Sequence, residues 1–170
     1  MGKIVIVGSG PAGCSAALYA ARAGQEVVVI SMGMGALSKA ELIQNYYGFE
    51  EGITGAELYR QGVAGAKAVG AEFITAEVVG LDYTGSLVVQ TTEGDYPADA
   101  VILATGAGRI APKIAGLAEH EGRGVSYCAT CDAFFYRGKT AAVLGSGEYA
   151  LHEVQALLPL AGRVILCTNG

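Results

Sequence analysis

The residues KIVIVGSGPAG, at positions 3–13, constrain the fold of this chain more than any other stretch. They join a continuous apolar run, typical of a buried strand in a parallel sheet, to three glycines in G-x-G-x-x-G spacing. An alanine-rich segment with helical composition follows, Gly24 is placed to end it, and EVVVI at 26–30 reads as a second apolar strand. Strand, glycine turn, helix and strand form one βαβ unit, which predicts a parallel α/β sheet.

The glycine loop predicts a dinucleotide site. Gly8 suits the tight turn, Gly10 lets the backbone approach a pyrophosphate, and Gly13 permits close packing of helix on strand. The fingerprint usually has Asp or Glu at the end of the second strand, whereas this chain has Ser31, which we expect to bond the ribose more weakly than a carboxylate would. A glycine turn with no ligand is the alternative.

The segment from residue 54 to residue 103 predicts a helix followed by strands. Thr54 and Glu57 have the spacing of a capping box, so we expect a second helix to start there. Residues 72–103 alternate or are rich in β-branched side chains, which predicts a strand-rich insert that returns to a final buried strand. The fold class expected is a Rossmann-like three-layer α/β domain with a parallel sheet and a β insert.

The same strand, glycine loop, helix and strand pattern recurs near the end of the chain. TAAVL, GSGEYA, LHEVQALLPLAG and RVILC follow one another, and Gly145, Gly147 and Ala150 occupy the three loop positions. Two strands and a helix cannot cover both faces of a sheet, so this second nucleotide-binding unit is expected to be incomplete. The predicted division is a first domain over 1–110, a linker over 111–124 and a partial domain over 125–170.

Composition excludes some partners. The chain has 170 residues, is 52% hydrophobic and carries a formal net charge of −5, which argues against nucleic acid or an anionic membrane as its main partner. The opening apolar run is too short for a signal peptide, and no stretch approaches membrane-spanning length. We therefore expect a soluble cytoplasmic chain, in which Cys14 and Cys167 are small buried hydrophobes.

Two cysteines, Cys128 and Cys131, lie three positions apart and are followed by Asp132. A zinc site needs four ligands, and the two histidines, His120 and His152, match no zinc spacing, so no metal site is predicted. We expect His152 to be a surface or capping residue.

A redox dithiol fits the pair better. A helix starting between the cysteines would favour the Cys131 thiolate, and Asp132 is placed to exchange a proton with a leaving thiolate. A plain acidic residue at a helix start is the alternative for Asp132. A dithiol needs an electron source, and a reduced flavin bound to the first unit would supply one.

From Lys3 to its end the sequence resembles the low-molecular-weight thioredoxin reductases. The strings GSGPAG, QNYYGF, ILATGA and CATCDAFFYRGK occur in that family's order. The resemblance implies an FAD domain interrupted by a pyridine-nucleotide domain that carries the dithiol. It also implies a homodimer in which one domain rotates against the other.

The resemblance assigns several positions to FAD. Asn45 would lie near the flavin ring, the backbone of Val78 would contact the adenine, and Thr105 with Gly106 would close the FAD segment. The pyrophosphate would be held by Gly8, Ser9, Gly10, Pro11, Ala12 and Gly13.

It also assigns the redox residues. Cys128 and Cys131 would be the redox pair, with Cys131 nearer the flavin, and Asp132 would be the proton donor. The loop Gly145, Gly147 and Ala150 would bind the pyridine nucleotide.

This chain departs from the family at three places. The Gly-Gly-Gln loop after the second strand is shortened to GMGALS, and the basic cluster that recognises NADPH is replaced by Thr168, Asn169 and Gly170. The family's remaining nucleotide domain and its return to the FAD domain are not found, so a second chain is an alternative to a homodimer.

These observations give one leading hypothesis and two alternatives. The first is a flavin-dependent reductase that passes electrons through FAD and the dithiol to thioredoxin or a thioredoxin-like protein, with NADPH a doubtful donor. The second keeps this fold but takes electrons from ferredoxin or another carrier. The third is a truncated, non-catalytic flavin-binding module.

Overall fold

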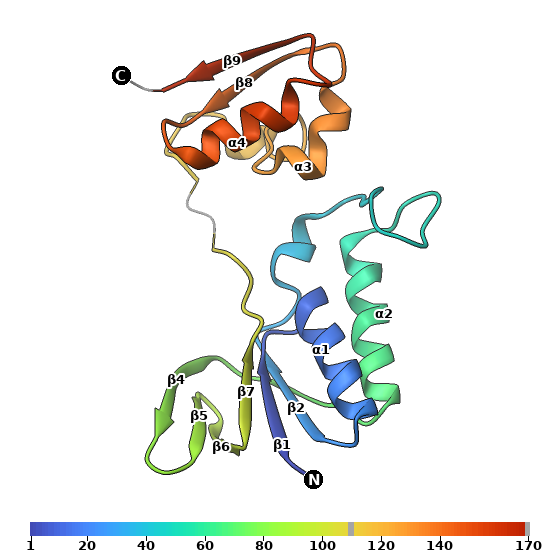
Figure 1. The fold of residues 1–170 in the computed structure, drawn as a ribbon, viewed down its shortest axis with the longest axis vertical. Coiled ribbons are helices and arrows are strands. Elements are labelled where there is room, and N and C mark those ends of the chain that lie inside the picture. Colours follow the sequence, from blue (N-terminus) through green and yellow to red (C-terminus); the bar gives the residue numbers. More distant parts are fainter. Residues whose placement is uncertain (109–110, 169–170) are drawn as a thin grey trace. The chain divides into compact units, whose positions relative to one another are not determined.

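A computed structural model describes residues 1–108 and 111–168 (Figure 1). The chain divides into two compact units, Met1–Ile110 and Ala111–Gly170. The first unit contains two sheets with two buried clusters, and the second contains one sheet with one buried cluster. The assignment of domains over 1–110, 111–124 and 125–170 stays a prediction.

The first unit is built on a four-stranded parallel sheet in the order β3-β2-β1-β7. Its strands are β1 (Lys3–Val7), β2 (Glu26–Ser31), β3 (Glu72–Thr75) and β7 (Ala100–Leu103). The predicted parallel sheet and the return of the chain to a final strand are therefore confirmed.

Helices cover one face of this sheet and an antiparallel sheet covers the other (Figure 1). The helices are α1 (Pro11–Arg22) and α2 (Gly55–Ala68), and the short 3-10 helix η1 (Gly35–Lys39) lies between them in sequence. The antiparallel sheet consists of β4 (Val78–Tyr83), β5 (Leu87–Thr91) and β6 (Gly94–Ala98). This is the expected three-layer arrangement with a β insert.

Alternate residues of β1 explain why its sequence is apolar throughout. Ile6 packs with the helices against Ala17 and Ala66, whereas Val5 and Val7 pack on the side of Val89. Because both faces of the strand are covered, neither can carry polar side chains.

The helix α2 begins where its capping sequence predicts. Thr54 is the N-cap, and its hydroxyl accepts a hydrogen bond from the Glu57 N–H at 3.2 Å. The Glu57 carboxylate bonds to Arg60 instead of returning to the cap, with oxygens 2.7 and 2.6 Å from the guanidinium nitrogens. Only the forward half of the capping box is formed.

The second unit has a two-stranded parallel sheet, β8 (Thr140–Leu144) and β9 (Arg163–Cys167), joined through α4 (Glu148–Leu157). The short helices η2 (Ala118–His120), α3 (Ala129–Asp132) and η3 (Ala133–Tyr136) precede it. Its buried core consists of Ala129, Ala133, Ala141 and Leu157. As predicted, the unit is incomplete: among residues 111–168, the side chains that pack against the helices come from one face of its sheet, and those of the other face are exposed.

Cys167 is exposed, so its predicted burial is wrong. Its strand packs against the core through Val164, while Ile165 and Cys167 alternate onto the open face. Cys14, in contrast, is buried as expected.

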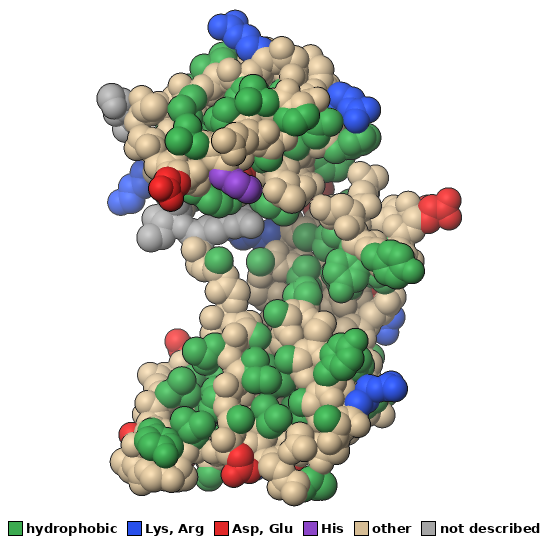
Figure 2. Space-filling view, viewed as in Figure 1, with side chains coloured by type: hydrophobic (Ala, Val, Ile, Leu, Met, Phe, Trp, Pro, Cys, Tyr) green, Lys and Arg blue, Asp and Glu red, His purple; other side chains and the backbone are tan. Residues whose placement is uncertain are grey.

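Hydrophobic side chains also reach the surface of both units. In the view of Figure 2 they lie among acidic and basic side chains that are scattered rather than gathered into one patch. In the second unit they include Leu144 of β8, with Ile165 and Leu166 of β9. Within residues 1–108 and 111–168, no helix has the length and apolar character needed to cross a bilayer.

Candidate dithiol and nucleotide sites

The first glycine loop joins β1 to α1 at the carboxyl end of the parallel sheet. Gly8 has φ +107°, and a Cβ added there would lie 2.3 Å from the carbonyl oxygen of Ala104. A Cβ on Gly13 would lie 1.9 Å from the Gly8 carbonyl oxygen, whereas nothing lies within 4 Å of one on Gly10. Neighbouring backbone atoms therefore leave no room for a side chain at Gly8 or Gly13. The space beside Gly10 is free, so a ligand can approach the backbone there.

Ser9 ties this loop to the rest of the unit. Its side chain is 2% exposed, and its Oγ accepts from Ser31 Oγ at 2.7 Å and donates to the Gly33 carbonyl at 3.2 Å. The Tyr59 hydroxyl of α2 lies 3.1 Å from the same Oγ. Sequence reasoning missed Tyr59 and Gly33 because both are distant from Ser9 along the chain. The structure thus shows Ser31 supporting the loop, and its predicted bond to a ribose stays a prediction.

Cys14 serves packing beside the loop. Its Sγ donates to the Ser9 carbonyl at 3.1 Å, and burial raises the pKa of the thiol. Cys14 is therefore a protonated thiol at neutral pH.

A cavity of about 170 Å³ opens between α1, α2 and the segment after η1. Its lining includes Pro11 of α1, Tyr46 and Tyr59. The cavity is lined both by Tyr46 of the QNYYGF segment and by Ser9 and Gly10 of the glycine loop. Asn45 itself is exposed and is not part of the lining.

The remaining residues assigned to FAD lie near the same sheet edge. Thr105 and Gly106 follow β7, and the Cα of Thr105 is 3.3 Å from where a Gly8 Cβ would lie. Val78 opens β4, two residues after Ala76, whose N–H bonds to the Ser31 carbonyl at 3.2 Å. Ligands of open α/β sheets bind outside the carboxyl ends of the strands, so this edge fits a dinucleotide. The individual contacts assigned to FAD stay predictions.

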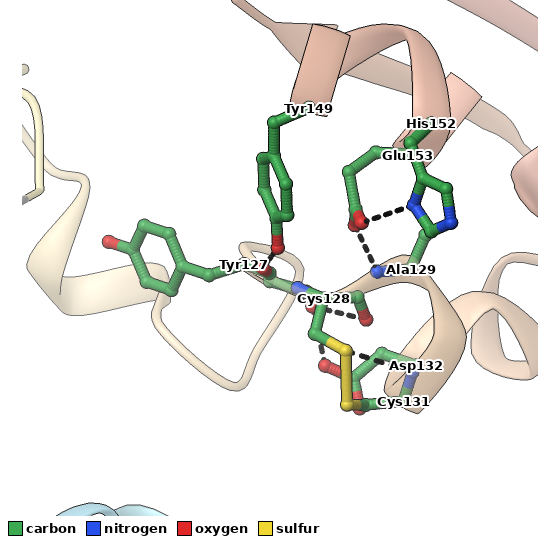
Figure 3. Close-up of a disulfide and its surroundings, with 9 residues drawn as sticks. Tyr127, Cys128, Ala129, Cys131, Asp132, Tyr149, His152 and Glu153 are labelled. Atoms are coloured by element: carbon green, nitrogen blue, oxygen red, sulfur yellow. Dashed lines mark hydrogen bonds and ion pairs between the residues drawn. A yellow bond between two sulfur atoms is a disulfide. The ribbon is translucent and has the colours of Figure 1, made fainter. Parts of the chain in front are cut away.

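Cys128 and Cys131 form a disulfide, with their Cα atoms 5.3 Å apart (Figure 3). Cys128 is the N-cap of α3 and Cys131 lies in its single turn, which is the position considered for it from the sequence. The Cys131 N–H lies 3.2 Å from Cys128 Sγ and donates to it. In the reduced protein this bond would favour negative charge on Cys128, whereas the favoured Cys131 thiolate expected from the sequence stays a prediction.

Asp132 is connected to the cysteine pair through Ser126. The Ser126 hydroxyl donates to Asp132 Oδ2 at 2.5 Å, and Ser126 Oγ itself accepts from the Cys128 N–H at 3.1 Å. Ser126 was missed by sequence reasoning, although a serine two residues before a capping position is a known turn signal. Burial, followed by the charge of Asp132, raises the pKa of Tyr136, which donates to the Gly124 carbonyl at 3.1 Å.

Side chains of the helix α4 bond to the backbone on both sides of Cys128 (Figure 3). Tyr149 donates to the Tyr127 carbonyl at 3.0 Å, and the Glu153 carboxylate accepts from the Ala129 N–H. His152 lies 3.5 Å from Glu153 and is 67% exposed, which confirms it as a surface residue. No sequence pattern connects Tyr149 or Glu153 to the cysteines.

The second glycine loop leads into α4. Gly145 has φ +153°, and a Cβ there would lie 2.9 Å from the Cβ of Ala150. Nothing lies within 4 Å of a Cβ added to Gly147, so the middle position is open, as it is at Gly10. The nucleotide predicted to bind here stays a prediction.

Comparisons with known proteins agree with this architecture. The sequence model of the family described as "Pyridine nucleotide-disulphide oxidoreductase" matches residues 2–168. A thioredoxin reductase of Aquifex aeolicus (strain VF5) is 37% identical, over 98% of this chain and 53% of its own length. A bifunctional thioredoxin reductase/thioredoxin of Mycobacterium leprae (strain TN) is 44% identical, over 96% of this chain and 37% of its own length.

Solved structures give the same result. A thioredoxin reductase from Streptococcus pyogenes MGAS5005 has a TM-score of 0.87 and 36% identity, over 96% of this chain and 54% of that one. One from Giardia duodenalis has a TM-score of 0.89 and 30% identity, over 97% and 55%. The chain spans about half the length of most of the relatives it matches, 53% for the Aquifex protein. It belongs to the pyridine nucleotide-disulphide oxidoreductase family, and the resemblance to part of a low-molecular-weight thioredoxin reductase is confirmed.

Proposed function

We propose that this chain is part of a flavin-dependent disulfide reductase that uses Cys128 and Cys131 to reduce thioredoxin or a thioredoxin-like protein. The observation that carries the proposal is the disulfide itself, with Asp132 linked to it through Ser126. A purely structural disulfide would need no such acid. The names of the relatives support thioredoxin as the class of partner.

We propose FAD as the cofactor of the first unit, and its chemistry when bound is to supply an electron pair. The open side at Gly10 and the start of α1 suit a pyrophosphate, which the backbone of the loop would bind. Ser9 and Ser31 would hold the loop in shape through their mutual bond.

Cys128, Cys131 and Asp132 would have different roles in the reduction of a partner's disulfide. Reduction of the Cys128–Cys131 disulfide takes up two electrons and two protons and gives two thiols. The Cys131 N–H would stabilise a Cys128 thiolate, and Asp132 would hold the proton that the Cys128 thiol releases when it forms the thiolate and that the thiolate later regains. Attack by a thiolate on the partner's disulfide forms a mixed disulfide, and the second cysteine then releases the partner as a dithiol. That Cys131 is the sulfur nearer the flavin stays a prediction.

The second glycine loop bears on the electron donor. The second loop, with Gly145, Gly147 and Ala150, suits a pyridine nucleotide, and the family name supports one. Of the residues that replace the basic NADPH cluster, Thr168 is described, and Asn169 and Gly170 lie outside the described residues. We propose NADPH first and a carrier such as ferredoxin second.

We further propose that the protein acts in the cytoplasm, as a homodimer or with a completing second chain. The open face of β8 and β9, with Leu144 and Ile165 exposed, supports a need for further covering structure. Sedimentation of the purified protein would measure its assembly.

An absorption spectrum and an anaerobic thiol count test the function. We expect oxidised-flavin bands, and reduction by dithionite should then produce two new thiols per chain. The double variant Cys128→Ser with Cys131→Ser should keep the flavin and gain no thiols. If the purified protein is colourless and still shows no flavin bands after incubation with FAD, the proposal is contradicted. If flavin is bound but its reduction produces no new thiols, the non-catalytic module is favoured. Bleaching by NADPH or by reduced ferredoxin then identifies the donor.

A further inference from the structure

The turn that holds the two cysteines is fixed from outside by α4, the helix that follows the second glycine loop. The Ala129 N–H, directly after Cys128, donates to Oε2 of Glu153. The Tyr127 carbonyl, directly before Cys128, accepts from Tyr149 at 3.0 Å. Figure 3 shows both side chains reaching from α4 toward the two sides of Cys128.

The Glu153 carboxylate is an unusual group to find at this place. Its side chain is 12% exposed, and the Ala129 that it bonds is 7% exposed. Withdrawing a carboxylate from water costs free energy unless hydrogen bonds compensate, and an apolar side chain would pack here without that cost. Its second oxygen lies 3.5 Å from Nδ1 of His152, which is largely in solvent.

We infer that Glu153 is a positioning residue of the Cys128–Cys131 dithiol. Its bond to Ala129 holds the turn in which the two sulfurs are adjacent, and its negative charge opposes formation of the thiolate. The inference rests on the proposed function only in treating the pair as redox-active.

The ionisable groups around the pair come from several elements, and the Glu153 variants leave all of them except Glu153 unchanged. Asp132 belongs to α3 and Tyr136 to η3, whereas Tyr149, His152 and Glu153 belong to α4. Tyr127 precedes the pair in sequence. Changing Glu153 alone therefore reports its own contribution.

Glutathione is the probe for positioning. In the equilibrium, the disulfide and two glutathione molecules give the dithiol and one glutathione disulfide. Glu153→Ala removes the acceptor from the Ala129 N–H, so the turn should loosen and the equilibrium should move about tenfold toward the dithiol. Glu153→Gln keeps a carbonyl acceptor, so its equilibrium at pH 6, where ordinary thiols are protonated, should stay within about twofold of the parent.

Alkylation by iodoacetamide is the probe for charge. Both Glu153 variants remove a negative charge, so the pKa of the more acidic thiol should fall and its reaction rate at pH 7 should rise about threefold or more. A Cys167→Ser background removes the exposed free thiol, and peptide mass spectrometry assigns the modified cysteine. Glu119→Gln is the matched control, because it removes an acidic charge from an exposed position of the same unit. Tyr149→Phe removes a bond from α4 without changing charge and should leave the thiol pKa unaltered.

The possible outcomes decide the question. Parent-like equilibria and thiol pKa values in both Glu153 variants would overturn the inference, as would equal changes in Glu119→Gln. An equilibrium shift in Glu153→Gln as large as that in Glu153→Ala would assign the effect to charge alone and reject the positioning role. If Glu153→Ala does not fold, the thiol pKa of Glu153→Gln decides the effect of the charge, and no shift there rejects the inference. None of these measurements needs FAD or thioredoxin, so the inference and the proposed function can fail separately.

Discussion

At the scale of single residues, the two glycine loops separate packing from ligand access. Gly8 and Gly13 have no room for a side chain, since the nearest backbone oxygens would lie 2.3 and 1.9 Å from an added Cβ. Gly10 has free space around it and φ −67°, which any residue adopts. One motif therefore contains glycines retained for two different physical reasons.

Paired alanine substitutions would test this separation. Gly13→Ala should destabilise the first unit by about 1–3 kcal/mol, because the methyl group overpacks the loop. Gly10→Ala should leave stability nearly unchanged and weaken FAD binding, since only the open side changes. Urea unfolding and flavin titration measure the two effects. Equal stability loss in both variants would refute the distinction.

Ser126 is a second residue whose proposed role depends on its own two hydrogen bonds. It bridges Asp132 Oδ2 and the Cys128 N–H, at 2.5 and 3.1 Å. In Ser126→Ala the acid loses its connection to the cysteine backbone. We therefore expect thiol–disulfide exchange to slow about tenfold, which is less than a complete loss of general acid–base catalysis would cause, because Asp132 itself remains. Ser126→Thr keeps a hydroxyl and should restore most of the rate. Stopped-flow exchange with a small disulfide measures both variants, and an unchanged rate in Ser126→Ala would exclude the bridge from the chemistry.

At the scale of elements, the first turn of α2 shows how charge acts on a surface helix. Glu57 bonds Arg60 and Gln61, and these bonds lower the pKa of its carboxyl from 4.5 to about 2. A lowered folded-state pKa adds stability above the unfolded pKa, and this stability is lost as pH falls from about 4.5 toward 2. Solvent and salt screen so exposed a pair, so the effect is small.

Thermal unfolding across this pH range would detect the effect. The parent should have a higher Tm than Glu57→Gln near pH 6, and the difference should shrink as pH approaches 2 and with added salt. Glu50→Gln changes an exposed carboxylate outside α2 and serves as the control. A pH-independent Tm difference would show that the Glu57 charge does not contribute.

Local patterns were enough to predict much of the molecule. Thr54 caps α2, Cys131 lies in the turn of α3, and β1 is buried on both faces, each because neighbours in sequence determine the result. Tyr149 and Glu153 could not be found in this way, because their contacts depend on how α4 packs against the cysteine turn. Cys167 was misjudged since its apolar neighbours do not reveal that one sheet face is open.

At the scale of the whole molecule, the two units differ in how much core they bury. The first has two clusters on either side of its sheet, centred on Val5 and Ile6. The second has one small cluster, with three alanines and Leu157 as its buried members. Units with less buried apolar area open at lower free energy.

Hydrogen exchange followed by mass spectrometry should show this difference. We expect amides of β8 and β9 to exchange well before those of β1 and β2, because opening the second unit exposes little apolar surface. Exchange in the presence of an excess of FAD should slow only the first unit. Equal protection of both sheets would contradict the proposed difference in stability.

The third position of each glycine loop has a consequence for exchanging the loops. At Gly13 the Gly8 carbonyl occupies the space of a methyl group, whereas in the second loop the Ala150 methyl itself covers Gly145. Grafting the first loop onto β8 and α4 would leave a methyl-sized hole, which is a tolerable defect. The reciprocal graft onto β1 and α1 would place the alanine Cβ 1.9 Å from the carbonyl oxygen of the first glycine. The second unit can therefore accept the first loop, but the first unit cannot accept the second loop.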